Sequence, residues 1–180
     1  MKGYAIFFDQ ESAERILAVR KKLEKHTQLF KPFNEEIDPH ITLNYSEEMN
    51  FEETDKSVKK YTEQNLPFEL KFCSIGIFPN QEHNVIFLNP QPNIILYNLY
   101  NLIRDLTIKQ KTVNDHDLFD AWVPHCTLTT KFEEENYAEF IKEIQSELKL
   151  SIDNPLRVKV SKCLKYEADI ENKKIELVEL

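Results

Sequence analysis

The chain has 180 residues, of which 41% are hydrophobic and 30% are charged, an ordinary composition for one globular domain spanning residues 1–180. No apolar run approaches the roughly 20 residues that a membrane-spanning helix needs, and the N-terminal residues do not resemble a signal peptide, so we expect a cytoplasmic protein without membrane contact. The net charge of −8 opposes binding to a long nucleic-acid duplex, although a local pocket can still be positive.

The number and spacing of the cysteines and glycines exclude several kinds of site. Cys73, Cys126 and Cys163 are odd in number and lie outside any Cys-x-x-Cys pattern, which predicts reduced thiols rather than disulfides or a zinc site. Gly3 and Gly76 are the only glycines, so the glycine-rich phosphate loops of ATP- and NAD-dependent enzymes are absent. No His, Asp and Glu spacing resembles a metal motif. We therefore expect neither a metal nor a cofactor.

The first half of the chain alternates strand and helix patterns. Apolar runs and turn residues predict a strand at 4–8, a helix with apolar positions from 13 to 23, a strand at 39–43, a helix at 51–63 and a strand at 68–72.

The second half repeats this order. The predicted elements are a strand at 85–88, a helix at 94–108, a strand at 124–128, an amphipathic helix at 137–148, a strand at 156–160 and a last strand at 174–180 after a turn at 169–172. An internal repeat of this kind predicts an α+β domain of two pseudo-symmetric lobes, built from residues of about 1–80 and 81–180. We expect two antiparallel-rich sheets lining a central cleft, with the helices outside.

Two copies of one short motif occupy the same place in the repeat. They are Pro39-His40-Ile41-Thr42-Leu43 and Pro124-His125-Cys126-Thr127-Leu128, and the other three histidines lack the pattern. In a strand, side chains alternate between faces, so His and Thr of each motif should project to one side and their apolar neighbours to the other. Pseudo-symmetry can then place two imidazoles and two hydroxyls around one cavity.

Such a cavity suits a phosphodiester. One imidazole can take a proton from the attacking oxygen while the other protonates the leaving oxygen, because an unperturbed histidine has a pKa of about 6.5. The hydroxyls of Thr42 and Thr127 can donate hydrogen bonds to the non-bridging phosphoryl oxygens. For a cyclic phosphate we take His125 as the base and His40 as the acid, although the symmetry makes these roles interchangeable.

The paired motifs, the order of the repeat and the 85-residue separation of the histidines resemble the two-histidine (2H) phosphoesterase superfamily, and within it the 2′-5′ RNA ligase-like proteins. This resemblance covers nearly the whole chain. It implies hydrolysis of 2′,3′-cyclic or 2′,5′-linked ribonucleotide phosphodiesters, or reversible joining of RNA ends, without metal or ATP. By resemblance His40, Thr42, His125 and Thr127 take the four motif positions.

Three aromatic residues are further candidates for contacting a substrate. Trp122, just before the second motif, can stack on a base or pack in the core, and packing is the simpler interpretation. Tyr4 on the first strand and Tyr166 on the strand after Pro155 can line the cavity and touch phosphate or sugar.

Two alternatives to a hydrolase remain open. A reversible 2′-5′ RNA ligase would use the same four residues, with an RNA hydroxyl in place of water. A non-catalytic nucleotide-binding module would not require two titratable groups. In each case the expected partner is a small nucleotide or an RNA terminus, bound by a monomer.

Overall fold

Helices and strands follow one another in the order that the sequence predicts. A computed structural model describes residues 2–23, 38–46, 50–78, 85–109, 122–129, 139, 141–142, 145–146, 149–169 and 174–180. Its elements are β1 (Lys2–Phe8), α1 (Gln10–Leu23), β2 (His40–Ser46), α2 (Phe51–Asn65), β3 (Phe68–Phe78), β4 (Val85–Pro90), α3 (Ile94–Lys109), β5 (Cys126–Thr129), β6 (Leu156–Asp169) and β7 (Lys174–Glu179). Of the predicted helix at 137–148, the five described residues are helical, and the rest lies outside the described residues. So does most of the predicted turn at 169–172.

The first helix of each half begins in the same way. Asp9 follows β1, and its carboxylate accepts a hydrogen bond from the backbone N–H of Ser12 at 3.0 Å. Asn93 follows β4, and its side chain accepts hydrogen bonds from the N–H groups of Ile95 and Leu96, both at 3.0 Å. Both side chains satisfy backbone donors that the first helical turn leaves unpaired. The chain therefore turns from strand to helix by one mechanism in both halves.

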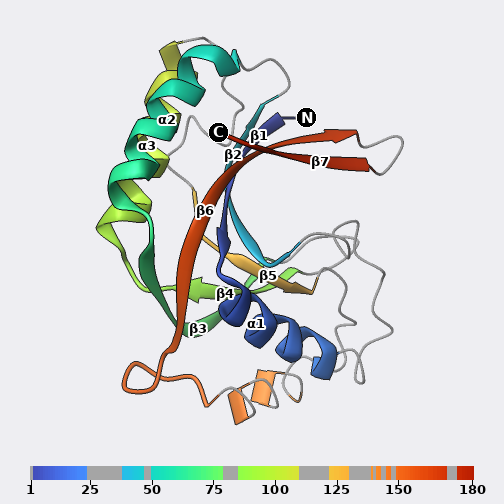
Figure 1. Ribbon diagram of the computed structural model, residues 1–180. Coiled ribbons are helices and arrows are strands. Elements are labelled where there is room, and N and C mark those ends of the chain that lie inside the picture. The colour runs from blue at the N-terminus through green and yellow to red at the C-terminus, as the bar shows by residue number, and fades with distance from the viewer. Residues whose placement is uncertain are drawn as a thin grey trace.

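All described strands pair antiparallel in a single seven-stranded sheet. The α+β class is thus confirmed, whereas the expectation of two separate sheets is corrected. The reason is β6, a strand of 14 residues that pairs with β3 along its first part and with β1 and β7 along its second part. Figure 1 shows β6 running the length of the molecule, with α2 and α3 lying together beside the sheet.

The strand order reflects the internal repeat. Read along the sheet, it is β2-β1-β6-β3-β4-β5, so a motif strand lies at each end, with the first strand of its own half beside it. The next position is filled in each case by the third strand of the other half, β6 beside β1 and β3 beside β4. The helices are exchanged as well, because α1 contacts β5 and α3 contacts β2. Each half of the sequence therefore supports the motif strand of the other half.

The two motif strands carry a β-bulge at equivalent positions. Leu43 has no partner on β1, since the register passes from Thr42 to Asn44, and Leu128 has none on β4, where it passes from Thr127 to Thr129. In both motif strands one extra residue therefore directly follows the threonine. Such bulges bend a strand and redirect its side chains.

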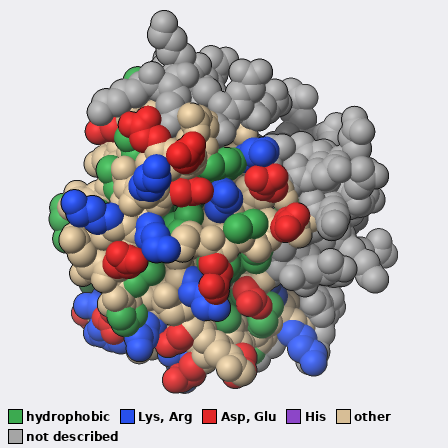
Figure 2. All heavy atoms as spheres, turned by 45° about the horizontal axis from the view of Figure 1, so that its top comes forward, with side chains coloured by type: hydrophobic (Ala, Val, Ile, Leu, Met, Phe, Trp, Pro, Cys, Tyr) green, Lys and Arg blue, Asp and Glu red, His purple; other side chains and the backbone are tan. Residues whose placement is uncertain are grey.

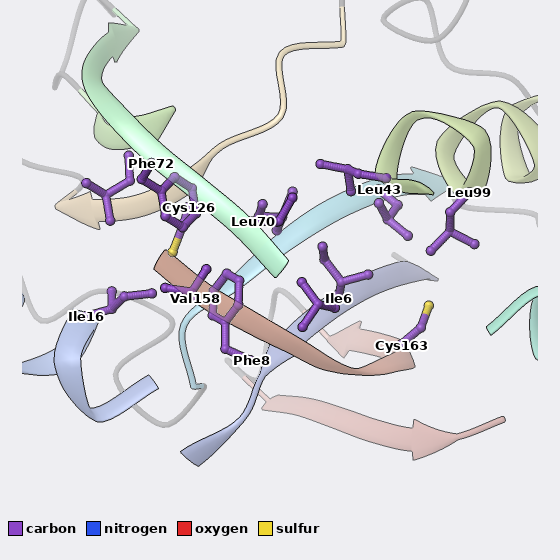
Figure 3. Packing of buried hydrophobic residues seen from close by; sticks show 14 of the residues in the cluster. Ile6, Phe8, Ile16, Leu43, Leu70, Phe72, Leu99, Cys126, Val158 and Cys163 are labelled. Atoms are coloured by element: carbon purple, nitrogen blue, oxygen red, sulfur yellow. The ribbon is translucent and has the colours of Figure 1, made fainter. Parts of the chain in front are cut away.

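The hydrophobic core lies on one face of the sheet, beneath α1 and α3. Side chains from β1, β3 and β6 meet there, as Ile6, Phe72 and Val158 show in Figure 3. Ile16 of α1 and Leu99 of α3 pack against them, and both are at most 1% exposed. Removal of this apolar surface from water is the main force that holds the helices on the sheet.

The surface carries both signs of charge. On the face shown in Figure 2, basic and acidic side chains are intermixed, so its described part has no continuous basic surface of the kind that binds a long phosphate backbone. Among the described helices, none combines the length and the apolar character needed to cross a bilayer.

Candidate active site

The two motif strands touch although they lie at opposite ends of the strand order. The sheet is therefore curled, and β2 contacts β5. The indole N–H of Trp122 donates a hydrogen bond to the backbone carbonyl of Thr42 at 3.1 Å. The backbone N–H of His40 is also close enough to the Cys126 thiol to lower its pKa. The structure thus brings the two His-x-Thr motifs together, as the repeat predicts.

The side chains of both motifs alternate as expected. Residues opposite one another in antiparallel strands share a face, and His40 and Thr42 lie opposite Phe7 and Ala5 of β1. The apolar motif residues point into the core and are at most 5% exposed; they are Ile41, Leu43, Cys126 and Leu128. The histidines and threonines are half-buried on the other face. We call this surface the histidine face.

Each motif histidine is held by the backbone two residues before it. The Nδ1 of His40 lies 2.9 Å from the carbonyl oxygen of Asp38, and the Nδ1 of His125 lies 2.8 Å from that of Val123. A carbonyl only accepts hydrogen bonds, so the proton of each neutral ring must be on Nδ1. Each Nε2 then carries a lone pair, and it has no hydrogen-bond partner among the residues that the structure describes.

Burial keeps both histidines predominantly neutral. It lowers the pKa of His40 and that of His125, because a charged ring loses hydration there, while the carbonyl contacts oppose this effect. For His40, the positive charges of Arg20 and of His125 lower the pKa further. The mutual repulsion also shows that the two rings lie within electrostatic range of one another.

The surroundings of the two rings differ. Phe7 packs against the His40 ring with a centroid separation of 5.5 Å. Two aromatic rings flank His125, namely Phe78 at 5.0 Å and Phe87 at 5.2 Å, and they stack on each other at 4.3 Å. Gly76 makes this arrangement possible, since a Cβ there would lie 2.2 Å from the Phe87 ring. The His125 side is therefore more apolar and aromatic than the His40 side.

The threonine hydroxyls are available to a ligand. Neither Thr42 nor Thr127 makes a side-chain hydrogen bond to any described residue, and both are half-buried on the histidine face. Two donors and two imidazoles thus share one surface. In chemical terms, this set can bind a phosphate group and move protons at two of its oxygens.

Of the three aromatic residues predicted to contact a substrate, Tyr4 lies where no substrate can reach it. It is 0% exposed on the core face of β1, and its hydroxyl donates a hydrogen bond to Asp55 at 2.6 Å. Burial and the Asp55 carboxylate both raise the pKa of this tyrosine. We therefore correct the prediction: Tyr4 shares the face of Ile6 and belongs to the core.

Trp122 and Tyr166 have structural partners. The Trp122 ring stacks on Tyr100 with a centroid separation of 4.1 Å and an interplanar angle of 6°, and its N–H is bonded to β2. Tyr166 lies opposite Gly3, on the same face as His40, and its hydroxyl donates to the carbonyl of Asn44 at 3.1 Å. Trp122 thus follows the packing interpretation, whereas Tyr166 stays a predicted substrate contact.

Sequence reasoning missed Arg20. This residue of α1 donates two hydrogen bonds to the carbonyl oxygen of Thr127, at 2.6 Å from Nη2 and 3.1 Å from Nε. A signal for it exists, because Arg20 comes 11 residues after the capping Asp9 and Arg104 comes 11 residues after the capping Asn93. In the described ranges, no group of three or more His, Cys, Asp or Glu side chains is arranged to hold a metal ion.

Comparison with known families shows to which superfamily the chain belongs. Residues 8–167 match the family model described as the 2′-5′ RNA ligase superfamily. The chain belongs to this superfamily. No curated protein matches the sequence.

Three solved structures share the fold of this chain. E. coli LigT complexed with 3′-AMP is 18% identical, with 99% of this chain and 94% of that chain covered and a TM-score of 0.64. The protein TT0787 of Thermus thermophilus is 16% identical, with the same coverage and a TM-score of 0.62. A structure described as a phosphoesterase is 18% identical with a TM-score of 0.60, again covering 99% and 94% of the two chains. At these identities the likeness establishes the fold of the superfamily.

Proposed function

We propose that the protein is a metal-independent phosphoesterase that hydrolyses 2′,3′-cyclic or 2′,5′-linked ribonucleotide phosphodiesters. The observation that carries this proposal is the equivalent geometry of the two histidines: each Nδ1 is held by a backbone carbonyl, and each Nε2 has no hydrogen-bond partner in the described part of the chain. Two neutral rings that differ in surroundings can act as an acid and base pair once one of them takes up a proton. A bound phosphate would favour that proton, because it places negative charge beside both rings.

The reaction at a 2′,3′-cyclic phosphate follows from these groups. One Nε2 accepts a proton from water as the water oxygen bonds to phosphorus. The protonated Nε2 of the other histidine donates its proton to the ribose oxygen as the bond from phosphorus to that oxygen breaks. Thr42 and Thr127 donate hydrogen bonds to the non-bridging oxygens, where negative charge increases in the transition state. After release of the monoester, the proton returns between the rings through solvent.

A small nucleotide or an RNA terminus is the proposed substrate. LigT, whose fold this chain shares, has been crystallised with 3′-AMP, with NADP⁺, with ATP and with phosphate. The net charge of −8 is also more compatible with a short ligand than with a long duplex. The monomeric state and the cytoplasmic location stay predictions.

The first experiment is incubation with the four 2′,3′-cyclic nucleotides in EDTA, with separation of 2′- from 3′-phosphate products. Wild-type protein should turn over at least one of them, and His40→Gln and His125→Gln should each lose about 10²–10⁴-fold in kcat, the usual contribution of a positioned acid or base. Loss of activity in EDTA that zinc or magnesium restores would contradict the metal-independent mechanism.

The threonines permit a matched comparison. Thr42→Val and Thr127→Val each remove one donor to the phosphoryl oxygens, and we expect kcat to fall about 10²-fold with a smaller change in KM. Thr62→Val is the control, since the Thr62 hydroxyl donates to the Lys59 carbonyl on α2 instead. Equal effects of all three substitutions would mean that the motif threonines only support the fold.

The description of the superfamily favours one second candidate, a reversible 2′-5′ RNA ligase. It would use the same residues, with an RNA 5′-hydroxyl as the attacking group. RNA fragments bearing a 2′,3′-cyclic phosphate and a 5′-hydroxyl distinguish the two. A joined 2′,5′ product would establish ligation, and opening of the cyclic phosphate to a monoester that stays on the RNA end would establish hydrolysis.

A further inference from the structure

We propose that Arg20 is a positioning residue that connects the two His-x-Thr strands through α1 and makes the two histidines electrostatically unequal. This inference rests on the proposed function for its catalytic meaning. Its physical part concerns the protein without substrate.

The first step is the anchoring of β5. The Arg20 guanidinium donates two hydrogen bonds to one backbone oxygen, that of Thr127, at 2.6 and 3.1 Å. A charged donor forms a stronger hydrogen bond to a carbonyl than a neutral one does. β5 is only four residues long and lies at an end of the sheet order, so much of its position depends on such contacts. Arg20 therefore fixes the strand that follows His125.

The second step connects this anchor to the other motif. The Cys126 thiol lies close enough to the Arg20 side chain and to the backbone N–H of His40 for both to act on its pKa. Burial raises the pKa of the Cys126 thiol to about 11, and these two donors oppose that rise. Arg20, Cys126 and His40 thus form a continuous chain of contacts from α1 through β5 to β2. The two motifs are joined on the core side, opposite the face where a substrate would bind.

The third step is the inequality of charge. The positive charge of Arg20 lowers the pKa of His40, whereas the pKa of His125 is lowered by burial; the repulsion between the two rings acts on both alike and does not distinguish them. The other titratable groups that act on His40 are His125, directly before β5, and Asp38, just before β2. Lys162 on β6 lies on the same face, across Phe7, and the thiol of Cys126 is neutral at pH 7. Arg20 therefore biases His40 toward the neutral form, so that when the pair takes up one proton, His125 is the ring that holds it.

This difference in charge reverses the acid and base roles of the two histidines. With the proton on His125, the free enzyme would present His40 as the base and His125 as the acid for cyclic phosphate hydrolysis. This is the opposite of the assignment that we made from the sequence alone.

The test compares substitutions at two arginines of α1. Arg20→Gln removes the charge but keeps an amide that can donate to the Thr127 carbonyl, and Arg20→Lys keeps the charge. Arg15→Gln is the control, because Arg15 also donates from α1 to a distant backbone oxygen, that of Arg157 at 3.1 Å, and makes no contribution to either histidine. NMR titration reports the pKa of each histidine, and the pH profile of kcat/KM reports the active pair.

In wild-type protein His40 should titrate at lower pH than His125. Arg20→Gln should raise the pKa of His40 more than that of His125 and lower kcat/KM by about 10- to 100-fold, since small displacements of catalytic groups have effects of this size. Arg20→Lys should restore most of the His40 shift, and Arg15→Gln should change neither histidine.

Either of two results would overturn the inference. One is a wild-type titration in which His125 loses its proton first, a measurement that needs no variant and no turnover. The other is an Arg20→Gln protein whose histidines titrate as in the wild type while its stability falls as in Arg15→Gln, which would make Arg20 a helix anchor only. The titrations require no substrate. Their outcome is therefore independent of whether the protein hydrolyses the proposed substrates.

Discussion

Each motif histidine donates its Nδ1 proton to a carbonyl two residues earlier, at 2.9 Å for His40 and 2.8 Å for His125. The ring orientation is thus set by the turn that begins the strand and by the proline between carbonyl and ring. A substrate arriving on the histidine face meets Nε2 in both cases. The strand and its preceding turn therefore act together as the unit that presents the imidazole.

The tautomer of each ring is a testable consequence. Above the pKa of both rings, the proton of His40 and that of His125 should lie on Nδ1, because the backbone carbonyls can only accept. Long-range ¹H–¹⁵N correlation spectra distinguish the two tautomers. Observation of a protonated Nε2 in either neutral ring would contradict the geometry described for it.

The pH dependence of activity also follows from the surroundings of the rings. Burial lowers the pKa of both histidines from about 6.5. A pair that must hold one proton works best between its two pKa values, so kcat/KM should reach its maximum below about pH 6.5 and decline toward alkaline pH. A profile of kcat/KM from pH 4.5 to 8.5 checks this. A maximum above pH 7 in the free enzyme would show that burial is not the dominant influence.

At the residue scale, the sequence predicts the motif residues well, but it predicts poorly which other residues hold them in place. His40, Thr42, His125 and Thr127 stand out because two identical patterns share one place in a repeat. Tyr4 was misplaced even though its spacing from Ile6 and Phe8 puts it on their face of β1, a pattern visible in the sequence. Arg20 belongs to no local motif, since its hydrogen-bond acceptor, the Thr127 carbonyl, is 107 residues away along the chain.

Among the elements, the junction between β2 and β5 depends on Trp122. Trp122→Phe keeps an aromatic ring on Tyr100 and removes the N–H that donates to the Thr42 carbonyl, together with part of the indole ring system. We expect a loss of about 1 kcal/mol in the free energy of unfolding, the usual value of one such hydrogen bond. We also expect kcat to fall more than KM rises, because the relative position of the motifs changes. Urea unfolding and steady-state kinetics measure the two effects.

The same variant tests the other interpretation of Trp122. If the indole were a platform for a nucleobase, phenylalanine would still stack, and the effect would appear in KM and would differ between bases. A KM change confined to purine substrates, with unchanged stability, would favour that interpretation.

Element boundaries were predictable because apolar periodicity and polar caps mark them. The bulges at Leu43 and Leu128 were not, since they arise from pairing with β1 and β4, which a single strand's pattern does not specify. The prediction of two sheets was wrong for a related reason. The sequence after residue 160 continues as an extended strand, and only its partners on both edges show that it unites the sheet.

The stability of the whole molecule should depend on pH through the buried histidines. Their folded pKa values lie below the unfolded value of about 6.5, so between these values the unfolded chain binds more protons than the folded one. The free energy of unfolding should therefore fall as pH decreases below about 6.5. Urea unfolding at pH 7.5 and 5.5 measures this decrease.

A double variant supplies the control for this prediction. His40→Gln with His125→Gln keeps polar side chains at both positions but removes their titration, so the decrease in stability between pH 7.5 and 5.5 should become smaller. An unchanged decrease would assign the effect to other groups.

The exchange of supports between the two halves has a consequence for how the chain can be divided. α1 contacts β5 and α3 contacts β2, while β6 and β3 each join the first strand of the other half. A fragment ending between β3 and β4 would leave its histidine strand without the helix that covers it. Two such fragments, each largely unfolded alone, should reconstitute one another on mixing, so that catalytic complementation would appear only when both are present.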